Sequence, residues 1–404
     1  MTEGRPARIA VYGFFGMGNL GNEGSLAAFL LHLRTKLPAA EVRCFAGDVE
    51  TVRREHGLPT TLLMASGPAD ARGVTSYVTK ALLRLWDVPR TFRLMRGTDL
   101  LVVPGMGVLE SKFATSPWGM PLWLLAAVAS CRVRGGRVAI LSIGADVPES
   151  PVTRRFFRWT ITLADYCSYR DAGSQEAART IGVRGRLGPV RPDLAFSLPE
   201  PSVAAVRPGH VVVGVMVYEG EPHMSVRGPE LVREYVDKMT TVVGRLVDAG
   251  RTVTLVVGDL ADNDLAEEIG RRARAGRDAA SVVVSRAASL TELMVEMGRA
   301  EVVVASRFHN VLCALKMARP VVSLSYAAKN RELQAEFGLH DLDQPIEAFD
   351  VDLLLEQVER ASGLGTRATL SMRTTADGYR DVLAAQYDEA LDLAVVPELT
   401  AAVR

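Results

Sequence analysis

Several protein classes are excluded by what this 404-residue sequence lacks. It has four cysteines but no Cys-x-x-Cys pair, and no Cys/His group has the spacing of a structural zinc site. Lys plus Arg and Asp plus Glu number 47 each, so the formal net charge is zero and gives no general attraction to nucleic acid. The most apolar stretch, residues 121–131, is about half the roughly 20 residues of a membrane span. We therefore expect no bound metal, no nucleic-acid partner and no transmembrane helix.

The start of the chain lacks the apolar core of a signal peptide, since its first residues lead directly into a strand. This favours a cytoplasmic protein. In that reducing compartment, isolated cysteines behave as small buried apolar residues rather than as disulfide partners. We expect this of Cys44, Cys131, Cys167 and Cys313.

What the sequence does contain is a repeated alternation of short apolar segments and amphipathic segments, with 48% hydrophobic residues in total. Such alternation is typical of mostly parallel sheets covered by helices on both faces, the α/β class. The alternation predicts strands at 8–13, 41–46, 99–103, 137–142, 166–169, 211–217, 252–257, 281–285, 301–304 and 320–324. The helices are predicted at 23–37, 121–134, 151–164, 229–249, 262–274, 289–298, 309–318 and about 368–396.

The chain is too long for one ordinary hydrophobic core, and its alternation is interrupted once. Residues 199–209 contain three prolines and a glycine without helical or strand periodicity. We predict a Rossmann-like domain over 1–200, a linker over 201–208 and a second Rossmann-like domain over 209–367. A helical segment over 368–404 is expected to pack back on the first domain. Ligands of such folds bind beyond the carboxyl ends of the strands.

A glycine-rich loop follows the first strand. Gly16, Gly18 and Gly21 satisfy Gly-x-Gly-x-x-Gly between a strand and a helix, a pattern that lets backbone N–H groups approach an anion. Dinucleotide binding is the rival interpretation, since Asp48 follows the second strand where a ribose-binding acid belongs, although Asn22 and the acidic Glu23 suit a pyrophosphate poorly. A further alternative is that Asn22 only caps the helix.

A second polar loop follows the strand at 301–304 and contains Ser306, Arg307 and His309. Arginine offers a planar fork for carboxylate or phosphate, and histidine transfers protons near neutral pH. Arg307 and His309 project to the same side if strand geometry persists through them. The alternative is that His309 packs at the helix start while Arg307 pairs with an acid.

The next strand, 320–324, is followed by Tyr326 and Lys329. If both strands are parallel, these side chains lie at the same sheet edge as Arg307 and extend its site. An ordinary solvated loop is the alternative.

Taken together, these fragments resemble the polysaccharide pyruvyl transferase family over most of the chain. The resemblance rests on the order and spacing of five pieces. They are the loop Gly16 to Glu23, Pro104-Gly105-Met106-Gly107-Val108-Leu109, Arg170-Asp171-Ala172-Gly173-Ser174, Asp193-Leu194-Ala195-Phe196, and Ser306-Arg307-Phe308-His309-Asn310 with Ala314-Leu315, Pro320-Val321 and Ser325-Tyr326 to Lys329 behind it.

The resemblance implies a fold like the two-Rossmann-domain glycosyltransferases of the B type. It also implies a transferase that moves the enolpyruvyl unit of phosphoenolpyruvate onto hydroxyls of a glycan, glycolipid precursor or other hydroxylated acceptor. Phosphoenolpyruvate is a co-substrate and no cofactor is implied. The first domain is the expected acceptor side and the second the donor side. His309 is carried over as the acid–base residue and Arg307 as the donor-binding arginine. The expected substrate-binding set is Gly18, Asn19, Gly21, Asn22, Glu23, Gly105, Gly107, Arg170, Ser306, Tyr326 and Lys329, in which Arg170 is a second anion-binding candidate or an ion-pair partner of a nearby acid.

The sequence departs from the family pattern at three places. Asn22 replaces an acid, Pro104 and Met106 interrupt a run of glycines, and Phe308 replaces a smaller aliphatic residue. Two other functions therefore stay open. One is a nucleotide-sugar-dependent glycosyltransferase of the same architecture, and the other is a non-catalytic or NAD-binding protein that uses the first glycine loop.

Overall fold

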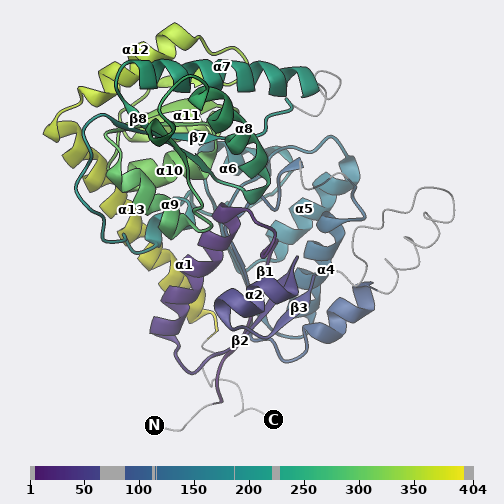
Figure 1. Ribbon diagram of the computed structural model, residues 1–404. Coiled ribbons are helices and arrows are strands. Elements are labelled where there is room, and N and C mark those ends of the chain that lie inside the picture. The colour runs from purple at the N-terminus through teal and green to yellow at the C-terminus, as the bar shows by residue number, and fades with distance from the viewer. Residues whose placement is uncertain are drawn as a thin grey trace, which may run out of the picture. The chain divides into compact units, whose positions relative to one another are not determined.

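The computed structural model describes residues 5–63, 87–111, 114, 116–185, 187–220 and 228–394. The chain divides into two compact units, each built on its own sheet (Figure 1). The first unit comprises 1–17, 25–194 and 382–404, and the second comprises Gly18–Gly24 and Ala195–Asp381. The short segment Gly18–Gly24 therefore makes its contacts in the second unit, although it precedes most of the first unit in the chain.

The sheet of the first unit has six parallel strands in the order β3-β2-β1-β4-β5-β6. This 3-2-1-4-5-6 order is that of the Rossmann fold, in which the order reverses between the first and the fourth strand. Four of the five residues of β1 and all five of β4 are buried, as expected for strands covered on both faces. The strands are β1 (Arg8–Tyr12), β2 (Glu41–Ala46), β3 (Thr60–Leu62), β4 (Leu100–Pro104), β5 (Arg137–Ile143) and β6 (Tyr166–Tyr169).

The helices of the first unit follow from local capping signals. Asp48, Ser150 and Asp171 each accept hydrogen bonds from backbone N–H groups in the first turn of a helix, and a proline follows Ser150 directly. The helices are α1 (Leu20–Lys36), α2 (Val49–His56), α4 (Met120–Val133), α5 (Pro151–Leu163) and α6 (Ala172–Thr180), of which α1 starts in the second unit.

The sheet of the second unit has the order β12-β11-β10-β7-β8-β9, again parallel. As in the first unit, a central pair of strands marks the place where the order reverses, here between β7 and β10. The strands are β7 (His210–Val215), β8 (Thr252–Val257), β9 (Val282–Val284), β10 (Val302–Ala305), β11 (Val321–Ser325) and β12 (Asp343–Pro345). The predicted α/β class with two Rossmann-like domains is confirmed.

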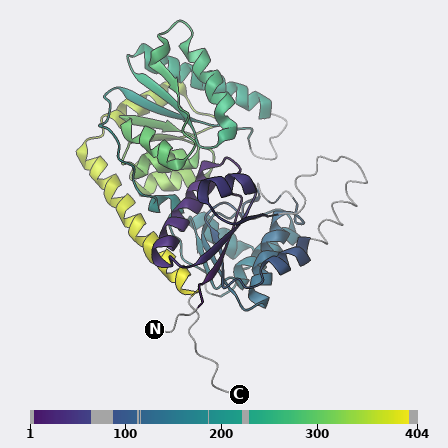
Figure 2. The ribbon, with the colours of Figure 1, turned by 60° about the horizontal axis from the view of Figure 1, so that its bottom comes forward.

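Two groups of helices cover the second sheet: α7 packs on α8 and α12, whereas α10 packs on α9 and α11. Figure 2 shows this layering, with helices on both sides of the strands. The helices are α7 (Gly228–Asp248), α8 (Asn263–Arg274), α9 (Leu290–Arg299), α10 (Phe308–Lys316), α11 (Ala328–Glu336) and α12 (Val351–Ser362), with short 3₁₀ turns at Leu194–Ser197, Leu260–Asp262 and Ala279–Ser281.

The last helix, α13 (Thr366–Asp392), is continuous in Figure 2, and its residues up to Asp381 belong to the second unit while those from Val382 belong to the first. None of the four cysteines forms a disulfide, and Cys44, Cys131 and Cys313 are buried. Within the described part of the chain, no helix combines the length and the apolar character that crossing a bilayer needs.

The starts of two helices differ from the sequence-based interpretation in ways that affect the site. The first helix was expected from residue 23, but it begins at Leu20, so Gly21, Asn22 and Glu23 lie in its first turn rather than in a loop. A solvated loop was the alternative interpretation of the segment around Lys329, but Lys329 is the second residue of α11. In both places the first turn of the helix has no strong apolar periodicity, so the sequence pattern does not indicate where the helix begins.

Candidate functional site

Arg307 and His309 lie where β10 ends, at the point where the strand order of the second sheet reverses. Open α/β sheets bind ligands at this reversal, beyond the carboxyl ends of the strands. Strand geometry does not persist through both residues, because β10 stops at Ala305 and α10 starts at Phe308. Arg307 is the extended residue before α10, with φ −75° and ψ 138°, and His309 is in the first helical turn.

The guanidinium of Arg307 is held by a carboxylate that the sequence did not single out. Arg307 donates from Nε and Nη2 to the two oxygens of Asp262, which is 1% exposed. The Nη2 bond is 2.8 Å long, and Asp262 also accepts from the backbone N–H of Val217 at 3.0 Å. Burial alone lowers the pKa of Arg307, but the hydrogen bonds and charge of Asp262 outweigh it, so this pKa lies above its usual value. Arg307 is therefore charged and fixed in direction.

The imidazole of His309 lies directly against Gly21. A Cβ atom placed on Gly21 would overlap the Cε1, Nδ1 and Nε2 atoms of His309 well inside van der Waals contact. The constraint on position 21 is steric rather than conformational, since its backbone lies in the first turn of α1, a conformation that any residue adopts, and a side chain there would displace the ring or the helix start. The first turn of α1 forms one wall around the His309 ring.

The segment Gly18–Gly24 is anchored by the turn that follows β8. Asn19 pairs with Asp259 as an isolated antiparallel bridge, and its side-chain amide donates to the Asp259 carboxylate at 3.0 Å. The backbone N–H of Leu20 donates to the carbonyl of Gly258 at 3.2 Å, and that of Leu260 to the carbonyl of Gly18 at 3.0 Å. The turn that contains Asp262, the partner of Arg307, therefore also positions the glycine segment.

The N-terminus of α1 is occupied by these contacts. The Asn19 side chain accepts from the N–H of Asn22 at 3.2 Å, and the Asn19 carbonyl accepts from that of Glu23. Asn19, rather than Asn22, therefore caps the helix. Asp48, the acid expected at a ribose in the rival interpretation, instead caps α2 through bonds from Glu50 and Thr51. These bonds argue against a pyrophosphate at this helix end.

Two neighbours of Arg307 are fully buried. The hydroxyl of Ser306 bonds to that of Tyr235 at 2.8 Å, so this predicted substrate-binding side chain holds α7 to the end of β10. Asn310, also 0% exposed, is wedged between the ends of β7 and β8. A Cβ on Gly258 would come within 2.6 Å of its Oδ1, and one on Gly214 would overlap its Nδ2. Both glycines allow α10 to approach the sheet closely.

Tyr326 and Lys329 follow β11, which is parallel to β10 as predicted. The Lys329 ammonium lies 5.4 Å from the Tyr326 ring centre and 5.7 Å from that of Phe308. The Phe308 ring meets the His309 ring edge-on at 5.3 Å. The structure thus brings Tyr326 and Lys329 next to the residues after β10.

Gly105, Gly107 and Arg170 lie together in the first unit. Arg170 is 5% exposed and pairs with Glu110 at 2.8 Å, with Asp171 and Asp193 each at 3.6 Å. A Cβ on Gly107 would come within 2.5 Å of the Glu110 carboxylate. Three separate sequence fragments therefore converge on one buried charge cluster, and Arg170 acts there as the ion-pair partner of acids.

The loop that carries these glycines has unusual backbone angles. Gly105 has φ +65° and Met106 has φ +73°, a region that glycine adopts readily and other residues rarely. A Cβ on Gly105 would approach the Ser25 hydroxyl to 2.7 Å. Met106 therefore takes its strained conformation because the buried cluster and close packing around it fix the loop.

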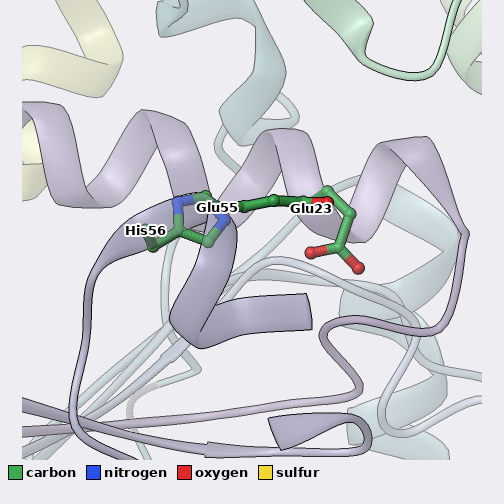
Figure 3. A group of neighbouring side chains, drawn as sticks. All are labelled: Glu23, Glu55 and His56. Atoms are coloured by element: carbon green, nitrogen blue, oxygen red, sulfur yellow. The ribbon is translucent and has the colours of Figure 1, made fainter. Parts of the chain in front are cut away.

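Glu23, Glu55 and His56 are potential metal ligands among the described residues. Figure 3 shows Glu23 on α1 and the other two at the end of α2. Glu23 belongs to the second unit by its contacts, whereas Glu55 and His56 belong to the first. Exposed acidic groups are common without a bound ion, so we assign no metal to these residues.

The fold has several solved counterparts. S. aureus MnaA, in a co-structure with UDP, gives a TM-score of 0.61 at 11% identity and covers 96% of this chain and 97% of its own. UDP-GlcNAc 2-epimerase from Neisseria meningitidis, bound to UDP-GlcNAc, gives 0.60 at 9% identity, covering 95% and 99%. Acinetobacter baumannii MurG gives 0.52 at 8% identity, covering 96% and 100%. The architecture is therefore that of the B-type glycosyltransferases, as expected.

A model of the polysaccharide pyruvyl transferase family matches residues 66–327, more than half of the chain. The chain belongs to this family. The matched region contains Arg170, Arg307 and His309 but not the glycine segment Gly18–Gly24. A search of curated proteins found no match.

Proposed function

We propose that this protein transfers the enolpyruvyl unit of phosphoenolpyruvate onto hydroxyls of a glycan or another hydroxylated acceptor, forming a pyruvate ketal and releasing phosphate. The proposal rests on Arg307 and His309, which lie together where the strand order of the second sheet reverses, in a member of the pyruvyl transferase family. The donor is a co-substrate, and we propose that no further cofactor takes part. Because this donor is a cytoplasmic metabolite, we place the protein in the cytoplasm.

The proposed reaction needs a proton donor and an anion holder. Protonation of the methylene carbon of the donor converts it to a methyl group and makes C2 an oxocarbenium-like electrophile. One acceptor hydroxyl oxygen bonds to C2 and loses its proton. The C2–O bond to phosphate then breaks, phosphate leaves with the bonding electrons, and a second hydroxyl oxygen bonds to C2 and loses its proton. The products are a ketal and inorganic phosphate.

His309 and Arg307 suit these two tasks. We assign to His309 the delivery of the proton to the methylene carbon, since a positioned imidazole is an effective general acid near neutral pH. We assign to Arg307 the donor carboxylate. Its Nε and Nη2 bind Asp262, while Nη1 has no hydrogen-bond partner among the described residues. The rigid pair with Asp262 supports preorganised binding.

Acceptor recognition is proposed for the first unit, through the loop with Gly105 and Gly107. Arg170 is buried under that loop in its ion pairs, so we propose that it supports the loop and does not itself bind an anion. We propose that the segment from Gly18 to Glu23 takes part in substrate binding indirectly. Its residues Gly18, Asn19, Gly21, Asn22 and Glu23 form the wall that positions the His309 ring.

The first test is ligand binding, followed by turnover. Thermal unfolding is compared with phosphoenolpyruvate, UDP, UDP-GlcNAc and NAD, for wild type and Arg307→Ala. We expect phosphoenolpyruvate alone to stabilise wild type, by about 2.7 kcal/mol at 100 times its dissociation constant, and to lose this effect in the variant. Stabilisation by UDP-GlcNAc or NAD, with none by phosphoenolpyruvate, would contradict the proposal.

His309→Gln separates binding from catalysis. We expect the variant to bind phosphoenolpyruvate as wild type does and to release phosphate at least 100-fold more slowly with a panel of methyl glycosides, because it lacks the proton donor. His340→Gln is the matched control, since His340 is exposed in the same unit. Substantial phosphate release by His309→Gln would remove His309 from the mechanism.

A further inference from the structure

The charge of Arg307 is largely balanced before any ligand binds. Its two hydrogen bonds to the buried Asp262 leave one guanidinium nitrogen, Nη1, for a ligand. A near-neutral ion pair in which one guanidinium nitrogen has no partner within the described part of the chain suits a singly charged carboxylate better than a phosphate of about two negative charges. The proposed donor carries both groups, so its phosphate requires a second cation, one that is not already paired with an acidic side chain.

A hollow of about 240 Å³ lies in the second unit beyond the ends of β11 and β12. Its lining includes Tyr218, Tyr326, Arg331 and Glu347. The hydroxyl of Tyr218 donates to the Glu347 carboxylate, which gives that acid a partner within the hollow. A space of this size is below the roughly 300–1,000 Å³ of pockets for drug-sized ligands, so it accommodates a small polar group.

Arg331 is a positively charged residue in the lining of this hollow. It forms neither a hydrogen bond nor an ion pair with any residue of the described ranges, although its charge acts on the nearby carboxyl of Asp343. That carboxyl accepts a hydrogen bond from the Ser325 hydroxyl. Arg331 is exposed and rises from the first turn of α11, so its five N–H donors are available to a ligand.

The start of α11 adds favourable polarity to the same place. Ala327 precedes the helix and provides no side-chain cap, and Ala327 and Ala328 both line the hollow. The N-terminus of a helix carries a partial positive charge and unsatisfied N–H groups, which favour phosphate. Arg331 and the start of α11 therefore both line the hollow.

The hollow adjoins the proposed catalytic residues. Tyr326 lines it, and the Lys329 ammonium lies 5.4 Å from the centre of the Tyr326 ring and 5.7 Å from that of the Phe308 ring. Phe308 contacts His309, and β10 and β11 are neighbouring strands. A ligand the size of phosphoenolpyruvate has its two anionic ends only a few bonds apart, which matches neighbouring strand ends.

We propose that the hollow beside Arg331 binds the phosphate of the donor, through the Arg331 guanidinium and the N-terminus of α11, while Nη1 of Arg307 binds the carboxylate. This subsite rests on the proposed function for the identity of the donor. It assigns to Arg331 the recognition of the group that later leaves as inorganic phosphate, so Arg331 determines donor specificity.

The test measures dissociation constants of inorganic phosphate, pyruvate and phosphoenolpyruvate by isothermal titration at low salt. Arg331→Met keeps the length of the side chain and removes its charge, and Arg331→Lys keeps the charge. Arg360→Met on α12 is the control, an exposed arginine outside the hollow. We expect Arg331→Met to weaken phosphate and phosphoenolpyruvate at least tenfold and pyruvate less than twofold. Arg331→Lys should recover part of the loss, and Arg360→Met should match wild type.

The outcomes separate this inference from the proposed function. If Arg331→Met binds phosphate and phosphoenolpyruvate as tightly as wild type, the subsite is wrong while donor binding stands. If wild type binds phosphate in an Arg331-dependent way but not phosphoenolpyruvate, the subsite binds phosphate and the proposed donor is wrong. If wild type binds none of the three ligands, both proposals fail. A tenfold loss for pyruvate in Arg331→Met with phosphate binding unchanged would reverse the assignment of the two ends, and an equal loss for both ligands would contradict the selectivity assigned to Arg331.

Discussion

Gly21→Ala places one methyl group where the His309 ring lies, and so tests whether the start of α1 fixes that ring. A Cβ atom at position 21 would overlap three ring atoms of His309, and no backbone strain accompanies the change because residue 21 is helical. By helix propensity alone, alanine would stabilise the helix by roughly 0.5–1 kcal/mol relative to glycine. The methyl group must instead displace the imidazole, or move the start of α1 away from Gly258.

We expect Gly21→Ala to remain folded but to lose roughly 10²–10⁴-fold in phosphate release, the range that a positioned acid–base group contributes. Misplacing the ring removes the same proton transfer as deleting it. The double variant Gly21→Ala/His309→Gln should therefore be no slower than His309→Gln alone, so the two effects are not additive. Gly378→Ala is the control, because Gly378 lies in α13 and a Cβ atom there would have nothing within 4 Å.

A second measurement does not depend on the acceptor. The sequence has only six histidines, so the imidazole NMR signal of His309 is assignable by its loss in His309→Gln. Gly21→Ala should shift this signal and leave that of the exposed His340 in place. An unshifted His309 signal together with phosphate release within threefold of wild type would refute the steric argument, and with it the role assigned to the glycine segment.

Two further predictions concern buried charges. Lys316 is 1% exposed and donates to the carbonyl of Phe196 at 2.6 Å, and burial lowers its pKa to about 8 from 10.5. Between these values the unfolded chain binds more protons than the folded one, so this group makes stability rise with pH. The free energy of unfolding of wild type relative to Lys316→Met should therefore increase by about 3 kcal/mol from pH 7 to 10.5 in urea titrations, and a difference that stays constant with pH would contradict this. Asp262→Asn should lower stability by about 3–5 kcal/mol in thermal or urea unfolding, because it leaves the guanidinium of Arg307 without its buried counter-charge. It should also weaken phosphoenolpyruvate binding at least tenfold, whereas the exposed Asp264→Asn should change neither property.

The architecture was predictable because it depends on residue periodicity over long segments. Continuous apolar strands such as β4 and β7, separated by amphipathic helices, indicate parallel sheets wherever they occur. The missed elements, among them α2, α6, α11, β12 and α12, are short or fall in segments rich in polar residues. Strand order followed only from the structure, since periodicity does not say which strands are neighbours.

The site was predictable where a residue's own position in the chain identified it. Arg307 and His309 follow a buried strand directly, and that position marks a ligand-binding edge in an α/β sheet. The position of Asp262 in the sequence does not identify it in this way, because Asp262 lies five residues after β8, in a turn that contains another acid, Asp259. Its importance comes from a contact with Arg307 across 45 residues of sequence, which no local pattern encodes.

The glycine segment shows how a motif can be identified correctly while its contacts differ from those that the motif predicts. Gly-x-Gly-x-x-Gly predicts an anion at a helix N-terminus, and that prediction requires the N–H groups there to be unpaired. Here the first-turn donors of α1 bind Asn19 and Gly258 instead. At the third glycine, Gly21, the His309 ring takes the space that a side chain would occupy. The same spacing that admits a pyrophosphate in other Rossmann folds thus admits an imidazole in this one, and the catalytic group proposed here is supplied by the second sheet rather than by a bound dinucleotide.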